Sequence, residues 1–409
     1  MTKKSDAPAI RFKGFSDAWE QRKLGDVVKE IIRNDPESEA PIMMITANNG
    51  FIEQSERYAF NNAGESLKKY ILLKKGELAY NHGASKLRPY GSCFALTTAE
   101  NARIPFVYHC FSAENQNAEF MSIELNGAEI ENQLRKIVSS GARMDGLLNI
   151  SFDEYTSVSV LLPGTEEQDR IADFFRHLDN LITLHQRKFE KLTNVKKSML
   201  EKMFPQNGSS YPEIRFKGFT DPWEQRKLGD IADIVGGGTP STGNQSYWDG
   251  DIDWYAPAEI ADQIYANSSQ KKITGLGYEN SSAKMLPPGT VLFTSRAGIG
   301  KTAILTRKGC TNQGFQSIVP HRGELDSYFI FSRTGELKRY GELVGAGSTF
   351  VEVSGKQMAV MELMMPPTMR EQQTIGGFFQ QLDHLITLHQ RELEKLQNIK
   401  KSMLEKMFV

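Results

Sequence analysis

Two blocks of this sequence each occur twice at one spacing, and this repeat constrains the fold more than any other feature. Ile10–Asp26 returns as Ile214–Asp230 with two substitutions, and Leu178–Phe204 returns as Leu382–Phe408. Both pairs are offset by 204 residues. Because two long matches share one offset, we infer a duplicated unit and expect a pseudo-two-fold internal repeat.

Between the matched blocks the two halves diverge. Residues 34–161 and 235–363 share only scattered glycine, serine and apolar positions. A chain of 409 residues is also too long for one ordinary domain. We therefore divide it into a first module (1–163), a first helix (164–205), a second module (206–365) and a second helix (366–409).

Both helical blocks predict long amphipathic helices. Glu166–Phe204 contains no proline or glycine, and its apolar residues recur at spacings of three and four. A helix of this length spans roughly 55–60 Å, so a small module cannot bury the whole stripe of apolar residues that runs along the helix. We expect the second block, Glu371–Phe408, to pack against it as an antiparallel coiled coil that brings Val409 near the first module. His185 and His389 fall on the stripe and are expected to be seam residues rather than metal ligands.

Each module is expected to be α+β. Short apolar runs separated by turn signals predict strands, and two longer stretches predict helices at Ala128–Ser139 and Asp326–Leu343. The expected strands are Ile42–Thr46, Leu78–Tyr80, Val291–Thr294 and Gln316–Val319.

Composition limits the classes of function. Net charge is −1, the pI is near 6.7 and mean hydropathy is −0.43. No apolar run reaches the ~20 residues of a membrane-spanning helix and no signal peptide is recognisable, so we expect a cytoplasmic protein. Cys93, Cys110 and Cys310 are expected to be core thiols. The near-neutral charge argues against binding nucleic acid by bulk electrostatics alone, so a DNA reader of this kind needs local basic patches or a partner.

The residues around the one motif that looks catalytic do not support a catalytic role. Ser295–Thr302 ends in Gly-Lys-Thr like a phosphate-binding loop, but the first glycine is replaced by Ser295. The residues after Thr302 predict a strand rather than the required helix. No metalloprotease, hydrolase or Cys/His motif is visible. We expect a non-catalytic chain without a metal site.

The full pattern resembles the specificity subunit of type I restriction-modification enzymes over essentially the whole chain. Two variable modules, two near-identical helical blocks, and the matching segments Trp19–Asp26 and Trp223–Asp230 carry the resemblance. The second module adds segments that look like family signatures: Gly237–Ser241, Tyr247-Trp248, Trp254, Pro257, Glu259-Ile260 and Asn312–Phe315.

The resemblance implies that DNA recognition, methylation and restriction belong to different subunits. Each module would be a target-recognition domain that reads one half of a split, asymmetric site in double-stranded DNA through the major groove, and the helices would set the gap between the halves. Two methyltransferase subunits would dock on the helices, bind S-adenosylmethionine and methylate adenine. Two restriction-translocase subunits would use ATP and Mg²⁺. Cofactors and catalysis would all belong to the partners, with none in this chain.

Polar residues in glycine-rich loops are the candidate DNA contacts, because their side chains reach base edges and glycine lets the backbone approach phosphate. Two pairs of corresponding loops supply most of them: residues 81–88 with 294–301, and residues 140–143 with 345–348. The candidates are Asn81, Ser85, Lys86, Arg88, Arg143, Thr239, Ser241, Ser295, Arg296, Lys301 and Ser348. The candidate partner-docking residues are Leu178, Leu181, Ile182, Leu192, Leu382, Leu385, Ile386 and Leu396.

Other interpretations of these patterns stay open. Any one of the loop residues is equally compatible with a plain solvated loop. The whole chain is also compatible with a structural adaptor that binds protein at both ends, which predicts no protection of DNA. A weaker alternative is an ATPase that uses Ser295–Thr302, which predicts that Lys301→Ala abolishes activity.

Overall fold

The computed structural model describes residues 7–47, 50–57, 64–138, 148–206, 208–261, 263–296, 298–345 and 352–408. They form two compact units: unit 1 is Met1–His185 with Glu392–Val409, and unit 2 is Gln186–Arg391. Both long helices contribute to both units. The units therefore divide within the helices rather than at the segment ends inferred from the sequence, because each half of a helix packs against a module.

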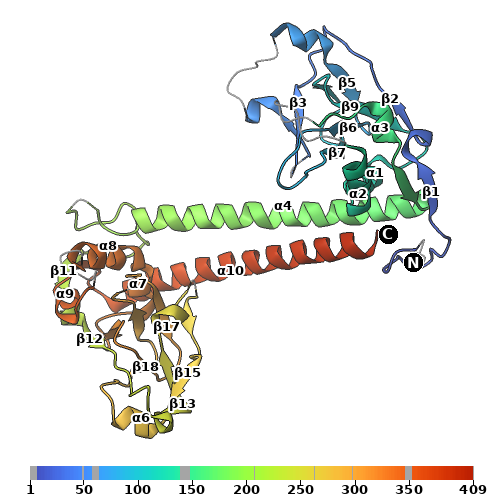
Figure 1. The fold of residues 1–409 in the computed structure, drawn as a ribbon. Helices are drawn as coiled ribbons and strands as arrows, with labels where there is room; N and C mark the ends of the chain where they lie inside the picture. Colours follow the sequence, from blue (N-terminus) through green and yellow to red (C-terminus); the bar gives the residue numbers. More distant parts are fainter. Residues whose placement is uncertain are drawn as a thin grey trace. The chain divides into compact units, whose positions relative to one another are not determined.

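Unit 1 contains a four-stranded antiparallel sheet in the order β2-β9-β6-β7 (Figure 1). Three strand pairs, β1-β10, β3-β4 and β5-β8, complete its strand content within the described residues. The strands are β1 Glu20–Lys23, β2 Val28–Glu30, β3 Met43–Thr46, β4 Gly50–Glu53, β5 Ile71–Lys74, β6 Leu78–Asn81, β7 Ser92–Ala95, β8 Asn101–Ile104, β9 His109–Ala113 and β10 Ser159–Leu162. The short helices are α1 Ala118–Leu125, α2 Ala128–Ile137 and α3 Phe152–Thr156.

Unit 2 contains a five-stranded sheet in the order β12-β19-β16-β17-β14 and a three-stranded sheet β15-β13-β18. A further pair, β11-β20, matches β1-β10 of unit 1. The strands are β11 Glu224–Lys227, β12 Ala232–Gly236, β13 Trp248–Tyr255, β14 Tyr265–Ala266, β15 Lys271–Ile273, β16 Val291–Phe293, β17 Thr302–Leu305, β18 Cys310–Thr311, β19 Gln316–Pro320 and β20 Glu362–Met365. The short helices are α5 Leu228–Ile231, α6 Gly275–Glu279, α7 Ser327–Ser332, α8 Thr334–Gly345 and α9 Gly355–Ala359.

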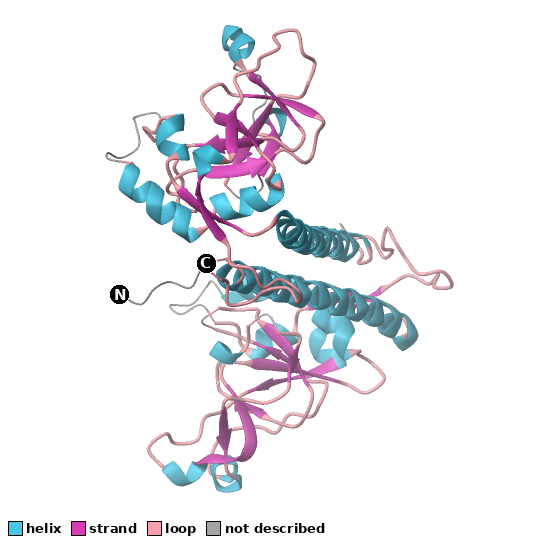
Figure 2. Ribbon diagram, turned by 90° about the vertical axis from the view of Figure 1, so that its right-hand side faces the viewer, coloured by secondary structure: helices cyan, strands magenta, loops and turns pink. Residues whose placement is uncertain are grey.

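Figure 2 shows strands and short helices together in both modules, which confirms the predicted α+β class. The expected strands form as β3, β6, β16 and β19, and α2 forms where the first module helix was predicted. The predicted helix Asp326–Leu343 is instead two helices, α7 and α8, because Arg333 leaves the helical conformation between them. Cys93, Cys110 and Cys310 are buried free thiols, as predicted.

The two long helices are α4 (Thr165–Lys202) and α10 (Met369–Lys406). Within unit 1 the first part of α4 lies beside the last part of α10, and Lys400 Nζ is 2.5 Å from Asp179 Oδ1. Within unit 2 the matching pair is Lys196 Nζ and Asp383 Oδ1, also 2.5 Å apart. The helices therefore run antiparallel in each unit, as predicted. In the described part of the chain no helix is long and apolar enough to cross a membrane.

The repeated blocks make the same contacts in each unit. Ile10 N donates to Lys406 O in unit 1, and Ile214 N donates to Lys202 O in unit 2, both at 2.9 Å. Trp19 packs edge-on against Phe408 with ring centroids 6.1 Å apart. In unit 2, Trp223 packs edge-on against Phe204 at 6.0 Å. The C-terminal helix thus returns to the first module; Val409 itself lies outside the described residues.

Candidate nucleic-acid interface

The loop at Ser295–Thr302 connects two antiparallel strands, β16 and β17. Thr294 holds it closed: its hydroxyl donates to Gly298 O at 2.7 Å and accepts from Lys301 N at 2.9 Å. The residues that follow Lys301 are the strand β17, as predicted. The loop therefore lacks the helix N-terminus of a phosphate-binding loop, and it is a β-hairpin connection.

The first candidate loop of each module is hydrogen-bonded to the segment that follows its second loop. In the first module, Leu148 follows the second loop and its N–H donates to His82 O, in the first loop, at 2.9 Å. In the second module, Val353 follows the second loop and its N–H donates to Ser295 O at 3.0 Å. In both modules a backbone hydrogen bond therefore links the first loop to the segment after the second loop.

The signature segments of the second module form one packed corner. Trp254 Nε1 donates to Gly238 O at 2.8 Å, and Gly238 N donates to Thr311 O at 2.9 Å. A Cβ on Gly237 would lie 1.9 Å from Asn312 O, and one on Gly238 would lie 2.3 Å from Ser282 Oγ. Only glycine fits such close backbone approaches, so these glycines shape the corner rather than contact a ligand.

The packed corner carries the polar side chains of the second module that are candidate DNA contacts. The Thr239 hydroxyl donates to the Gln313 side chain, and Ser241 is exposed beside it in the sequence. Arg296 Nε lies within 4 Å of the position that a Cβ on Gly314 would take. Thr239, Gln313 and Arg296 are therefore brought close together by segments far apart in the chain. Gln313 was missed as a site residue, although its signature segment had been recognised.

Arg296 and Lys301 supply the positive charge of this loop. Arg296 pairs loosely with Glu352, with Nη1–Oε2 at 3.9 Å, and more than a third of each side chain is exposed. Lys301 is exposed. Such side chains can turn toward phosphate or base edges, because a surface ion pair of this kind contributes little to stability.

The loop at residues 81–88 of the first module has fewer side chains available to contact DNA than its sequence indicates. Ser85 and Lys86 are exposed. Asn81 is tied down: its amide donates to Ile45 O at 3.0 Å and its carbonyl oxygen accepts from Gly83 N at 2.9 Å. Lys86 is therefore the cation of this loop that faces solvent.

Two expectations about DNA contacts do not hold. Ser295 is fully buried, and its backbone pairs with Gly314 and Val353, so its hydroxyl does not face solvent. The Arg88 guanidinium points inward and donates from Nη1 to Asn126 O at 2.7 Å. Burial lowers the pKa of Arg88. The predicted contacts Arg143 and Ser348 lie outside the described residues.

Two histidines that the sequence did not single out hold the first-module loop. His82 is buried, with Nδ1 2.8 Å from Leu148 O and Nε2 2.6 Å from Val107 O. His109 stacks on it with ring centroids 5.3 Å apart, and its Nε2 lies 3.0 Å from Ile150 O. Burial lowers the pKa of His109. Both rings therefore hold the segment Leu148–Ile150 against the first-module loop.

The helix residues proposed for partner docking fall into three groups by exposure. Leu178 and Leu382 are 7% and 8% exposed, so they belong to the interior of their units and do not fit that role. Ile182, Ile386, Leu192 and Leu396 are half-buried. Leu181 and Leu385 are 44% and 40% exposed and are available. The sequence missed Leu184 and Leu388, which are 46% and 45% exposed at matching positions.

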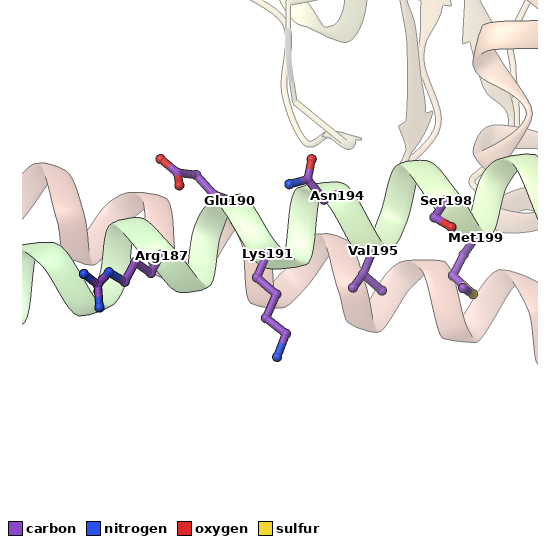
Figure 3. Close-up of a pocket in the computed structure, with 7 residues that line it drawn as sticks. All are labelled: Arg187, Glu190, Lys191, Asn194, Val195, Ser198 and Met199. Atoms are coloured by element: carbon purple, nitrogen blue, oxygen red, sulfur yellow. The ribbon is translucent and has the colours of Figure 1, made fainter. Parts of the chain in front are cut away.

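A hollow of about 520 Å³ lies along α4 in unit 2 (Figure 3). Its lining comes from one helix, and Val195 and Met199 also pack against the unit 2 core. Glu190 and Asn194 project from one side of the helix, whereas Lys191 projects from the other. This is an open surface on one face of a helix, and its side chains form no catalytic arrangement. Among the described residues, no three His, Cys, Asp or Glu side chains are placed to hold a metal ion.

Comparison with known proteins agrees with this arrangement. A family model described as the type I restriction modification DNA specificity domain matches residues 220–398. The MjaIX specificity subunit of a type I restriction enzyme from Methanocaldococcus jannaschii is 34% identical over 190 residues, covering 46% of this chain and 44% of that protein. The HindI specificity subunit from Haemophilus influenzae is 20% identical over 421 residues, covering 85% of this chain and 90% of that protein. Residues 220–398 are therefore similar to the type I restriction modification DNA specificity domain, and the chain as a whole is similar to specificity subunits of type I restriction enzymes.

The match to curated relatives is partial in length. The chain spans 44% of the MjaIX subunit and 60% of the putative MjaX specificity subunit from the same organism, to which it is 26% identical over 262 residues. A solved structure, the type I restriction-modification S subunit from M. genitalium, is similar with a TM-score of 0.60 at 12% identity. That likeness covers 98% of this chain and 99% of that protein, and it supports the fold.

Proposed function

We propose that this chain is the non-catalytic DNA-specificity subunit of a type I restriction-modification complex that acts in the cytoplasm. Each module reads one half of a bipartite DNA site. The observation that carries this proposal is that the two units share a near-identical repeated frame, whereas the modules held by that frame differ. The same Arg–Glu, Trp–Phe and Lys–Asp contacts recur in both units, while the sheets they hold differ in strand order.

The loops at residues 81–88 and 294–301, together with the packed corner of the second module, form the reading surface. Lys86 in the first module, and Thr239, Gln313, Arg296 and Lys301 in the second, offer the donors and acceptors that base edges and phosphates require. The chain has a net charge of −1, so these local cations rather than overall charge provide attraction to DNA. Partner subunits share the remaining phosphate contacts.

The helices set the gap between the two half-sites and dock the partners. Leu181 and Leu184 on α4 and Leu385 and Leu388 on α10 are exposed at matching positions in the repeat. Large exposed apolar side chains at regular helical spacing favour a protein-binding surface. One methyltransferase subunit docks at each copy, which brings S-adenosylmethionine; two restriction-translocase subunits, which use ATP and Mg²⁺, complete the complex.

A module exchange tests the proposal. The chain is expressed with its methyltransferase partner, and the second module is replaced by that of another specificity subunit at Trp223 and Met365, which lie in the repeated frame. Mapping of methylated adenines should show one half of the motif changed and the other retained. An unchanged motif would refute the proposal. Absence of DNA protection by the intact complex at low salt would instead support a structural adaptor.

A further inference from the structure

Unit 1 contains a cavity of about 1080 Å³ that the proposed DNA-reading function does not use. It lies between α1, α2, the first part of α4 and the last part of α10, all within this unit. Phe94, Ile123, Phe175, Leu404 and Phe408 contribute apolar surface to its lining. A space of this size with an apolar lining and few buried polar groups is typical of a site for an organic ligand.

One charged side chain of this cavity is more than nine-tenths buried. Glu124 on α1 is 8% exposed, and its Oε1 accepts from Leu161 N at 3.2 Å. Among the described residues, no arginine or lysine forms an ion pair with it. Burial, with a smaller contribution from the nearby charge of Glu129, raises the pKa of Glu124 to about 7. The ionised form of this buried carboxylate is costly without a cation, so a bound cation stabilises that form.

The residue of unit 2 that matches Glu124 shows which chemical group fits at this position. Helix α1 corresponds to α7, since Asn117 caps one helix at Phe120 N and Asp326 caps the other at Phe329 N. Four residues after each phenylalanine stand Glu124 and Arg333. Arg333 donates from Nη1 to Met364 O, on the strand that matches the Leu161 strand.

The guanidinium of unit 2 occupies an aromatic site. The Arg333 guanidinium carbon is 5.4 Å from the Phe204 ring and 5.7 Å from the Phe329 ring, and it pairs with Glu336 at 2.8 Å. In unit 1 the matching rings, Phe408 and Phe120, are present with centroids 5.7 Å apart. Unit 1 therefore keeps both rings, of which Phe408 lines the cavity, and it has the carboxylate of Glu124 at the position that Arg333 holds in unit 2.

We propose that this cavity binds an organic cation, a guanidinium or ammonium group on an apolar stem, with Glu124 as its counter-ion. The cation gains the Glu124 carboxylate and the aromatic rings that line the cavity, which are Phe94, Phe175 and Phe408, and the stem covers the apolar lining. This inference concerns unit 1 alone and does not depend on DNA recognition.

Other charged groups face the cavity and neutralise one another in part. Arg176 pairs with Glu119, and Lys400 pairs with Asp179. Arg88 donates to a backbone carbonyl, Glu129 lies on α2, and Lys401 and Glu405 stand at the rim on α10. Glu166 on α4 is exposed and does not line the cavity, so it provides a carboxylate for a control substitution.

Calorimetric titration of the full chain tests the proposal. Agmatine serves as a free cation, and N-acetyl-arginine N-methylamide serves as a mimic of a protein side chain. We expect one site that weakens at least tenfold in Glu124→Gln, whose amide still accepts from Leu161 N, and that is unchanged in Glu166→Gln. Preference for agmatine would indicate a small-molecule ligand, and preference for the amide an arginine from a partner.

Proton release gives a second readout. Near pH 7 a bound cation favours the ionised form of Glu124, so binding should release protons, and the measured heat should differ between phosphate and Tris buffers. Absence of binding by both probes would overturn the proposal. Equal binding by the wild type and Glu124→Gln, or binding without proton release, would overturn it as well.

Discussion

Arg11 and Glu167, 156 residues apart, form a bidentate ion pair with Nε–Oε1 at 2.6 Å and Nη2–Oε2 at 2.7 Å. Arg215 and Glu371 repeat the pair at the same separation, with distances of 2.7 and 2.9 Å. Each pair joins the start of a repeat to the start of its long helix. The copies differ in one respect: Trp223 Nε1 donates to Glu371 at 3.2 Å, whereas the buried Trp19 Nε1 has no hydrogen-bond partner.

This difference predicts unequal costs of removing the two carboxylates. Glu167→Ala should lower the free energy of unfolding by about 3 kcal/mol, because it leaves a largely buried guanidinium unpaired. Glu371→Ala should cost roughly 1 kcal/mol more, because the Trp223 indole also loses its acceptor. Urea denaturation of the full chain measures both.

The exposed pair Arg226–Glu324 provides the control for these substitutions. Its side chains are 35% and 48% exposed, so Glu324→Ala should change the free energy of unfolding by less than about 1 kcal/mol. Equal losses for all three variants would contradict a structural role for the repeated pairs.

Lys301 and Lys308 stand beyond opposite ends of β17, and both are exposed. If the loop before β17 faces DNA, Lys301→Ala should weaken binding by the complex at all sequences and reduce the slope of log K against log salt by about 1. Lys308→Ala should leave that slope unchanged. Fluorescence anisotropy over a salt series distinguishes them, and equal slopes for both variants would place the interface elsewhere.

The architecture was predictable because periodicity and repetition are local properties of the sequence. The apolar stripe gave both long helices, and the repeat implied their antiparallel pairing. The split of the second-module helix at Arg333 was not predictable, because it reflects a buried guanidinium held by Met364 O and two phenylalanine rings. Helix α1 was missed because its apolar residues show no marked helical periodicity.

The candidate interface was predictable as loops but not as individual side chains. Ser295 and Arg88 were reasonable contacts because polar residues in glycine-rich turns usually face solvent. Their actual partners, Gly314, Val353 and Asn126, are distant in the sequence and belong to divergent modules. The repeat cannot reveal such contacts, because only the frame is repeated.

Glu124 predicts a pH dependence of stability. Its pKa is raised from 4.5 to about 7 in the folded chain by burial, so the folded state holds this proton more tightly than the unfolded state. The stabilising contribution of the protonated form is complete below about pH 4.5 and is lost as pH rises through about 7. The loss amounts to roughly 3 kcal/mol at most.

Glu124→Gln removes this titration and keeps the hydrogen bond to Leu161 N. The variant should match the wild type near pH 5 and be more stable by roughly 2–3 kcal/mol at pH 8. Urea denaturation at both pH values measures the difference, and Glu405→Gln, at the exposed rim, should show none. If the stability of the wild type relative to the variant instead increased with pH, the predicted sign would be wrong.

Leu181 and Leu385 occupy matching positions and are about equally exposed, so they test whether the repeat presents two equivalent docking sites. Leu181→Glu should remove one methyltransferase subunit from the complex, Leu385→Glu the other, and the double variant both, because a buried carboxylate at a protein interface is strongly unfavourable. Neither substitution should change the thermal stability of the isolated chain, since both side chains already face solvent. Leu87→Glu, on an exposed module loop, is the matched control. Mass measurement by light scattering reports the stoichiometry, and two bound subunits in the double variant would place docking on another surface.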